Sequence, residues 1–481
     1  MSNISNRHNR IVLAGGAMVL AITAAVLAQE KPFMQAGTSQ PAPAWTAAPS
    51  ADSGANADAG GSPNAMQRFF NDYIPDAIAQ GKLNLNVRLR YEQLEYENVP
   101  GTTKESYVPT LRTRLGYTTA PLYGFQAMLE GVNVSVLGPE HNYNAAGTDG
   151  QAARPSVGDP PMTRLDQAWV GYSATNYAGF SAKVGQQQIN LDNQRFIGDA
   201  GWRQNMQTYE AAGARVCPLQ DLNLYYGYIW DVDRVYGDVS GLAPANQDFD
   251  SHSHLINVSY GGWEYGRFTG YAYLLDLSYG GAAAAKVNSC ATYGGSFAGA
   301  APVAGKFMID YRAEFAWQEN YGQSALRYSA GYYNVEMGGN IAPFAFGAGD
   351  ELLGSGANTG AGGGRGGFKT PLASPHPFNG WAEVFVNHPI NGLRDLYGYA
   401  QVTLPWQIPL RFVYHKYDAD IGSGDYGQEF DTVISKRFGK HWSVMAEFAD
   451  YLGENKAAGV PVLAAANTDT KSFWAAVEFN Y

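Results

Sequence analysis

Apolar and polar side chains alternate with a period of two along most of the chain after residue 82. In the first run, 83–91, leucine, valine and tyrosine alternate with asparagine and arginine. Because successive side chains of a β-strand point to opposite faces, this run predicts a strand with one apolar and one charged face. The alternation recurs, and we interpret eighteen runs as strands: 82–94, 108–119, 124–136, 162–175, 179–189, 205–217, 221–231, 252–260, 264–275, 306–318, 324–337, 341–346, 380–386, 393–404, 409–418, 426–438, 441–451 and 472–481.

Alternation alone also describes a soluble β-sandwich, in which the apolar face points into a shared core. Three features favour a membrane barrel. The runs have about the 10 residues that a tilted strand needs to cross a bilayer, 13% of the chain is aromatic, and the chain ends with Phe479 and Tyr481 on the apolar face. That ending resembles the terminal strand by which the barrel assembly machinery recognises outer-membrane proteins. We therefore predict an all-β fold, a transmembrane antiparallel up-and-down β-barrel of 18 strands, or 16 if the weak runs 341–346 and 380–386 are excluded.

The N-terminal part of the chain predicts export. Arg7 and Arg10 precede an apolar run that ends at the small residue Ala28, a pattern typical of a cleavable signal peptide over 1–28; the alternative is an uncleaved anchor. Residues 29–81 are rich in Ala, Pro, Gly and Ser, so we expect a low-complexity periplasmic lead with a short amphipathic segment at 66–80. The barrel would then occupy 82–481 in the outer membrane of a Gram-negative-type bacterium.

Long and short connections alternate between the predicted strands, as in an up-and-down barrel. The links 120–123 and 439–440 are expected to be periplasmic turns, and the longer segments 137–161, 231–251, 276–305, 347–379 and 452–471 to be outside loops. One connection, 185–205, is unusually polar and carries Phe196 and Trp202 as candidate anchors. We expect it to fold inward and narrow the pore, with an ordinary surface loop as the alternative.

Charged residues fall on the inward parity of many strands, although the net charge of -11 argues against a nucleic-acid partner. Arginines on such a face would lower the barrier for anions, and the alternative is that they only pair with lumen acids. The predicted pore-lining residues are Arg88, Arg90, Arg112, Arg114, Asp192, Arg195, Arg203, Arg312, Arg327, Arg394 and Arg411. The predicted lumen acids are Glu92, Glu130, Asp310, Glu314, Glu429, Asp431, Glu447 and Glu478.

No motif predicts catalysis, a cofactor or a metal. His252 and His254 lack a marked third ligand and are interpreted as polar loop residues, and the glycine run 362–367 lacks the strand-to-helix context of a phosphate loop. Cys217 and Cys290 have no metal-type spacing, and a disulfide between them is not expected.

Five segments in order, LNVRLRYEQLEYENV, TLRTRLGYTT, LDQAWVGY, KVGQQQINLDNQRFIGDAGWRQN and TYEAAGAR, resemble the alginate export family of outer-membrane porins. The resemblance implies a monomeric 18-stranded barrel whose arginine-rich constriction passes anionic polysaccharide. It implies a lining role for Arg88, Arg90, Arg112, Arg114, Asp192, Arg195 and Arg203. Where the family pattern has arginines on either side of a glutamine, this chain has Gln186 and Gln188.

The expected function is passive, anion-preferring diffusion of polar solutes, including an alginate-like anionic saccharide. The main alternative is a general or small-carboxylate porin with the same barrel. Two further candidates are a barrel-embedded enzyme and a non-conducting structural barrel. The expected partners are outer-membrane lipid, the assembly machinery and the solute itself.

Overall fold

The structure is a computed structural model, and it describes residues 65–97, 105–149, 151–174, 179–237, 242, 246–280, 282–324, 326–358, 367–422, 424–454 and 467–481. The predicted signal peptide and most of the low-complexity lead lie outside these residues. Three short helical turns come first, α2 (Ala65–Arg68), the π-helical turn η1 (Phe69–Tyr73) and α3 (Ile74–Ala79). No helix in the described part of the chain is long and apolar enough to cross a membrane.

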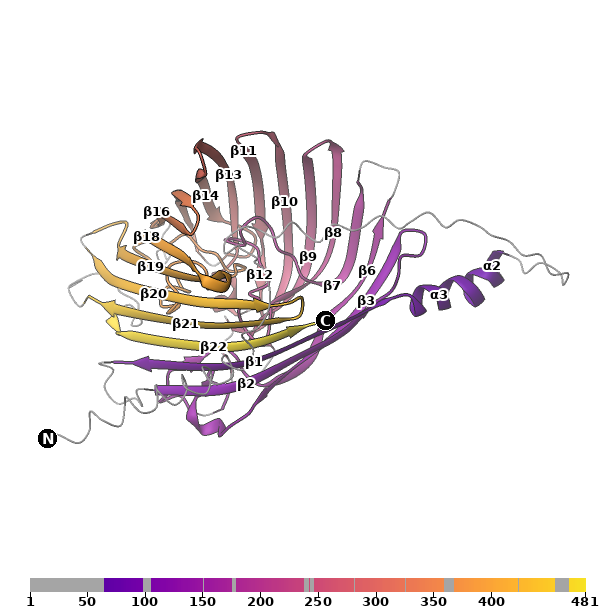
Figure 1. Cartoon of the computed structure of the whole chain (residues 1–481), viewed down its shortest axis with the longest axis horizontal. Coiled ribbons are helices and arrows are strands. Elements are labelled where there is room, and N and C mark those ends of the chain that lie inside the picture. The colour runs from indigo at the N-terminus through magenta and orange to yellow at the C-terminus, as the bar shows by residue number, and fades with distance from the viewer. Residues whose placement is uncertain are drawn as a thin grey trace.

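Eighteen long strands form the wall of a closed antiparallel barrel (Figure 1). They are β1 (Lys82–Tyr96), β2 (Glu105–Thr118), β3 (Phe125–Val136), β6 (Met162–Ser173), β7 (Ser181–Gln187), β8 (Thr208–Leu219), β9 (Leu222–Asp233), β10 (Phe249–Trp263), β11 (Gly266–Leu275), β13 (Cys290–Ala304), β14 (Phe307–Asn320), β15 (Tyr328–Ile341), β16 (Phe344–Leu353), β18 (Leu393–Leu404), β19 (Ile408–Asp418), β20 (Asp425–Phe438), β21 (Trp442–Gly453) and β22 (Thr470–Asn480).

Short elements lie in the connections between these strands. They are the two-residue strands β4 (Asn144–Ala145), β5 (Ser156–Val157), β12 (Leu277–Ser278) and β17 (Ala357–Asn358), and the turns η2 (Glu140–Asn142), α4 (Ala283–Lys286) and η4 (Pro405–Gln407).

The barrel closes between its first and last strands. β1 pairs with β2 on one side and with β22 on the other, with Val87 opposite Phe479. Each remaining wall strand pairs with its neighbours in the chain, so the topology is up-and-down. The predicted fold class and strand number are confirmed.

Two errors in the predicted strands cancel in the count. The run 380–386 is not a strand. It lies inside the barrel, where its Phe385 packs against Tyr417, Tyr426 and Tyr451. Residues 290–304, expected within an outside loop, form β13 instead. Their alternation is weak because glycine and alanine replace large side chains; a Cβ at Gly294 would lie 2.5 Å from the hydroxyl of Tyr271, so the neighbouring strand supplies the bulk.

The outward face of the wall is apolar and the inward face is polar. Leu115, Leu129 and Phe315 are 55%, 62% and 60% exposed on the outer side, whereas Arg112 and Glu314 are buried on the inner side. Exposed apolar area of this extent marks an interaction surface, and around a barrel that surface is the membrane.

The terminal strand supplies the first testable prediction. Replacing Phe479 and Tyr481 by aspartate puts two charges on the lipid-facing edge beside β1. A charged side chain on the lipid face costs up to about 2–4 kcal/mol at mid-depth for arginine or lysine, and less for aspartate and near the interface. We expect loss of the folded, heat-modifiable band in outer membranes. Asn480→Asp is the matched control, because Asn480 faces inward and accepts a hydrogen bond from Asn86. A normal yield of the Phe479/Tyr481 double variant would contradict the placement of these two side chains on the lipid-facing side.

Candidate functional site

Three connections fold back into the barrel. We call them the first (139–149 with 151–160), second (188–207) and third (367–392) lumen segments. The second and third lie side by side, with a parallel bridge between Ile197 and Leu372 and a hydrogen bond from Gly198 N to Leu372 O of 2.9 Å. The predicted inward fold of 185–205 is therefore confirmed. The placement of 137–161 and 347–379 as outside loops is wrong for most of their described residues, because polar wall residues and an apolar cluster hold them inside.

Arginines of β1 hold the second lumen segment by its backbone. Arg88 donates to Gln204 Oε1 at 2.8 Å and to the carbonyl of Trp202 at 2.9 Å. Arg90 donates to the same carbonyl at 2.7 Å. Each guanidinium group carries five N–H donors in a fixed fork. Two adjacent arginines can therefore satisfy the hydrogen-bond acceptors of a whole loop turn.

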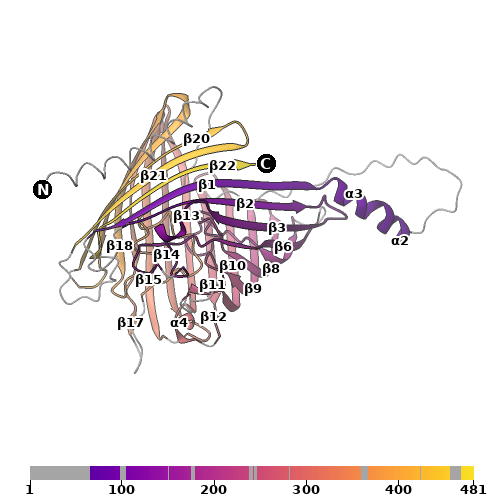
Figure 2. The same cartoon turned by 90° about the horizontal axis from the view of Figure 1, so that it is seen from below.

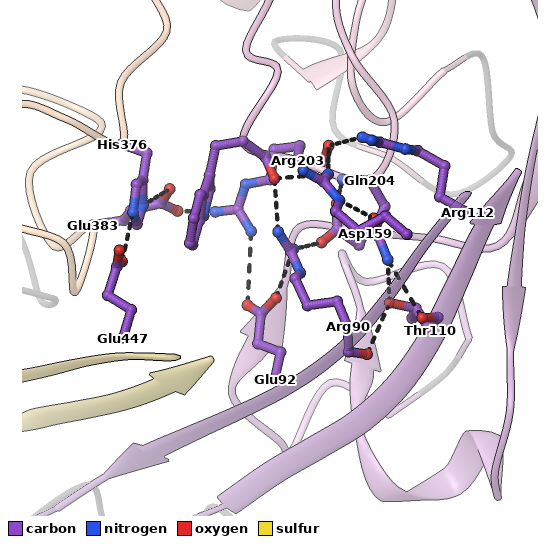
Figure 3. A network of polar contacts seen from close by, with 12 residues as sticks. Arg90, Glu92, Thr110, Arg112, Asp159, Arg203, Gln204, His376, Glu383 and Glu447 are labelled. Atoms are coloured by element: carbon purple, nitrogen blue, oxygen red, sulfur yellow. Dashed lines mark hydrogen bonds and ion pairs between the residues drawn. The ribbon is translucent and has the colours of Figure 1, made fainter. Parts of the chain in front are cut away.

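Arg90 also joins the first lumen segment to the second. It pairs with Glu92 at 2.8 Å and with Asp159 of the first segment (Figure 3). Asp159 in turn accepts from the backbone N of Gln204 at 2.7 Å. The predicted lining residue Arg90 is thus buried within a network that spans a strand and two segments.

The arginines of β2 lie next to those of β1, since Arg88 is opposite Arg112 in the register. Arg112 donates to Asn86 Oδ1 at 2.6 Å and to Glu478 at 3.1 Å. Arg114 approaches Asp166 at 3.2 Å. The structure therefore brings the four predicted strand arginines into one inward-facing group, which we call the basic wall (Arg88, Arg90, Arg112 and Arg114).

Arg195 connects the second segment to β16. It contacts Glu351 of β16 at 2.8 and 3.1 Å and donates to Asn379 of the third segment at 2.8 Å. Arg195 and Glu351 are 1% and 3% exposed. One buried guanidinium thus ties both segments to β16.

The third segment carries a buried histidine between two carboxylates. His376 lies 3.1 Å from Glu383 and 2.7 Å from Glu447 of β21, and its ring stacks on Trp202 at 3.7 Å (Figure 3). Burial and the positive charges of Arg203 and Arg90 lower the pKa of His376 well below its ordinary value. The ring therefore bridges the third segment and β21 through both of its nitrogens. Arg203 contacts both Glu383 and Glu92.

The remaining predicted lining residues divide into two groups. Asp192 accepts from Asn257 at 2.8 Å, Arg312 pairs with Glu314 at 2.7 Å, and Arg411 lies 4.3 Å from the Tyr399 ring, all on the inner side. Arg327 and Arg394 do not line the lumen.

Strand parity places Arg327 and Arg394 on the outer face of the barrel. At the start of β15 the buried residues are Tyr328, Ala330 and Tyr332; Arg327 directly precedes the strand with the opposite parity and is exposed. Arg394 is 49% exposed and pairs with Asp350 at 2.7 Å on the outer face. Likewise His252 and His254 are not loop residues: they lie on β10 and contact tyrosines of β9.

Sequence reasoning missed part of an acidic wall on β16–β21, which is separated from the basic wall on β1 and β2 by β22. Glu351 and Asp395 are buried and inward-facing on β16 and β18; with Glu429, Asp431 and Glu447, which were predicted, they form what we call the acidic wall. Parity could have found Glu351, but the strand was expected to end at 346. Among the described residues no group of His, Cys, Asp and Glu is arranged to hold a metal, and both cysteines are free.

Comparison with known proteins agrees with this architecture. The model of the family described as "Alginate export" matches residues 137–323, which confirms the resemblance. No curated protein matches the chain.

Solved porin structures share the fold. Acinetobacter baumannii OccAB2 is 11% identical at a TM-score of 0.61, covering 84% of this chain and 99% of its own. Pseudomonas aeruginosa OccK9 (OpdG) is 11% identical at 0.60, covering 84% and 100%, and P. aeruginosa OpdK, solved with vanillate, is 12% identical at 0.59, covering 84% and 99%. At these identities the likeness shows the fold alone, which is that of an outer-membrane porin. The expected outer-membrane location is confirmed.

Proposed function

We propose, from the match to the alginate export family and the porin fold, that the protein is a passive, anion-preferring channel for polar solutes. Its solutes would include carboxylate-bearing saccharides, and their concentration gradient would drive transport. We also propose that it acts without a catalytic step or cofactor, as a monomer inserted by the barrel assembly machinery after cleavage at Ala28. The lumen arginines and the inward segments support this proposal.

The observation that carries the anion preference is the chemistry around Arg88. This guanidinium is 7% exposed, and within the described part of the chain it donates to a side-chain amide and to backbone carbonyls, which are neutral. Its charge is therefore solvated by dipoles and not neutralised by a direct ion pair, so it adds a positive potential to the lumen that attracts anions. Arg112, directly opposite, adds a second positive charge that Glu478 balances only in part.

The acidic wall supports the general form of the second candidate, a porin for polar solutes of either charge, and not the small-carboxylate form, because an acidic lining repels carboxylates. Asp395, Glu429 and Asp431 are buried on the inner side, so different strands of the same lumen carry opposite charge. Such a lumen would orient any polar solute that carries both signs of charge.

Reversal potentials in planar bilayers distinguish the two candidates. We expect anion selectivity in dilute salt that fades in molar salt, because the Debye length shrinks from about 8 Å at physiological ionic strength to about 3 Å at 1 M. We also expect oligouronates to block the current more than neutral oligosaccharides of equal length. Cation selectivity in dilute salt would show that the acidic wall dominates and would overturn the proposal.

A further inference from the structure

The helical segment Ala65–Ala79, which we call the rim helix, exposes a large apolar face. Met66, Phe70 and Ile78 are 70%, 60% and 54% exposed, and Phe69 and Tyr73 are exposed as well. Met66, Phe69, Phe70 and Tyr73 have the i, i+3, i+4, i+7 spacing of one helix face. An apolar face of this kind marks an interaction surface.

The rim helix is attached to the lipid-facing side of the barrel. The hydroxyl of Tyr117 donates to the carbonyl of Ile78, and the backbone N of Ala120 donates to the carbonyl of Ala77 at 2.8 Å. Tyr117 shares the outward parity of Leu115, which is 55% exposed. Figures 1 and 2 show the helix continuing beyond the ends of β1, β2 and β3, away from the strands in both views.

The apolar face of the rim helix is continuous with the lipid-facing belt. The rings of Tyr73 and Tyr123 pack edge to face at 5.9 Å. Tyr123 is 68% exposed and precedes Phe125, which is 54% exposed at the start of β3. Lipid covers that belt, so the same leaflet is the nearest apolar phase for the helix. Aromatic residues are the ones that favour the level of the lipid headgroups.

We propose that the rim helix lies in the headgroup region of the periplasmic leaflet, with Met66, Phe70 and Tyr73 towards the acyl chains, and fixes the depth of β1–β3. The helix has one basic residue, Arg68, and two acidic residues, Asp72 and Asp76, so its charge does not attract it to anionic lipid. Burial of its apolar side chains supplies the attraction. Binding should therefore not require anionic lipid.

Lipid quenching on the full-length barrel tests this placement. A single cysteine at Met66 or Phe70, in a Cys217→Ser background with Cys290 left buried, is labelled with an environment-sensitive fluorophore. The protein is reconstituted in phosphatidylcholine vesicles with and without spin-labelled phospholipid. We expect blue-shifted emission and roughly threefold stronger quenching than for a label at Asp72 on the polar face, unchanged when phosphatidylglycerol is added.

Three results would overturn the proposal. Equal quenching at Phe70 and Asp72 would mean that the helix has no membrane-facing side. A blue-shifted label that spin-labelled lipid does not quench would mean that protein covers the face, and a dependence on protein concentration would identify a second copy. Met66 is the second label site because its side chain is exposed, so labelling removes no barrel contact. Heat-modifiability of each variant on gels confirms that its barrel is folded.

Discussion

Replacing Arg195 by alanine is expected to raise the single-channel conductance several-fold while the barrel stays folded. Arg195 is the buried link among the second segment, Glu351 of β16 and Asn379 of the third segment. Removing one partner of a buried ion pair costs about 3–5 kcal/mol, since the other charge is left uncompensated. The wall strands keep their hydrogen bonds, so the cost falls on the segments that narrow the lumen.

The measurement is conductance in planar bilayers, together with the rate of uptake of solutes of increasing size into vesicles. Arg394→Ala is the matched control, because it removes an arginine–aspartate pair on the outer face where the side chains are 49% and 27% exposed. Exposed pairs contribute about 0–1 kcal/mol, so we expect wild-type conductance. An unchanged conductance in Arg195→Ala would show that the segments do not limit the pore.

The double variant Arg112→Gln with Arg114→Gln is expected to move the reversal potential towards cations. Both side chains belong to the basic wall, and their acidic partners Glu478 and Asp166 would remain without them. The change removes two positive charges from the inner side of the wall and leaves Glu478, whose side chain is 26% exposed, as a negative charge beside the lumen. Lumen substitutions tune selectivity, and the folded, heat-modifiable band is checked for each variant because buried pairs are broken.

The effect should be large in dilute salt and small in molar salt, where charges are screened within about 3 Å. The matched control is Arg327→Gln with Arg394→Gln, which removes the same charge from positions that do not face the lumen. We expect its reversal potential to equal that of wild type. An equal shift in both double variants would mean that total charge, and not the basic wall, sets selectivity.

The wall of the barrel could be predicted because strand period is a local property. The alternation at 83–91 predicted β1, and the same parity predicted that Arg88 and Arg112 share a face, as their register confirms. Local information failed where alternation was weak. Cys290–Ala304 became a strand because neighbouring strands supply the bulk that its glycines lack.

Parity also predicted the wrong face for two arginines near strand ends, because the sequence does not show at which residue a strand begins. Arg327 directly precedes β15 and Arg394 is the second residue of β18, and at a strand end a shift of one residue exchanges the two faces. The polar run 185–205 indicated an inward segment, but its partners could not be predicted. Arg195 and Glu351 are separated by 156 residues, and His376 and Glu447 by 71.

By itself, the sequence determined that the chain forms an antiparallel barrel with an apolar outer face and arginines on the inner face of its first two strands. The period of two fixes each side chain to one face, and lipid outside permits only one choice of face. The tertiary structure alone decided which segments enter the lumen and which acid meets each arginine. Those contacts form only after closure brings β1, β16 and β21 around the same space, because no pattern within one strand encodes a partner on another.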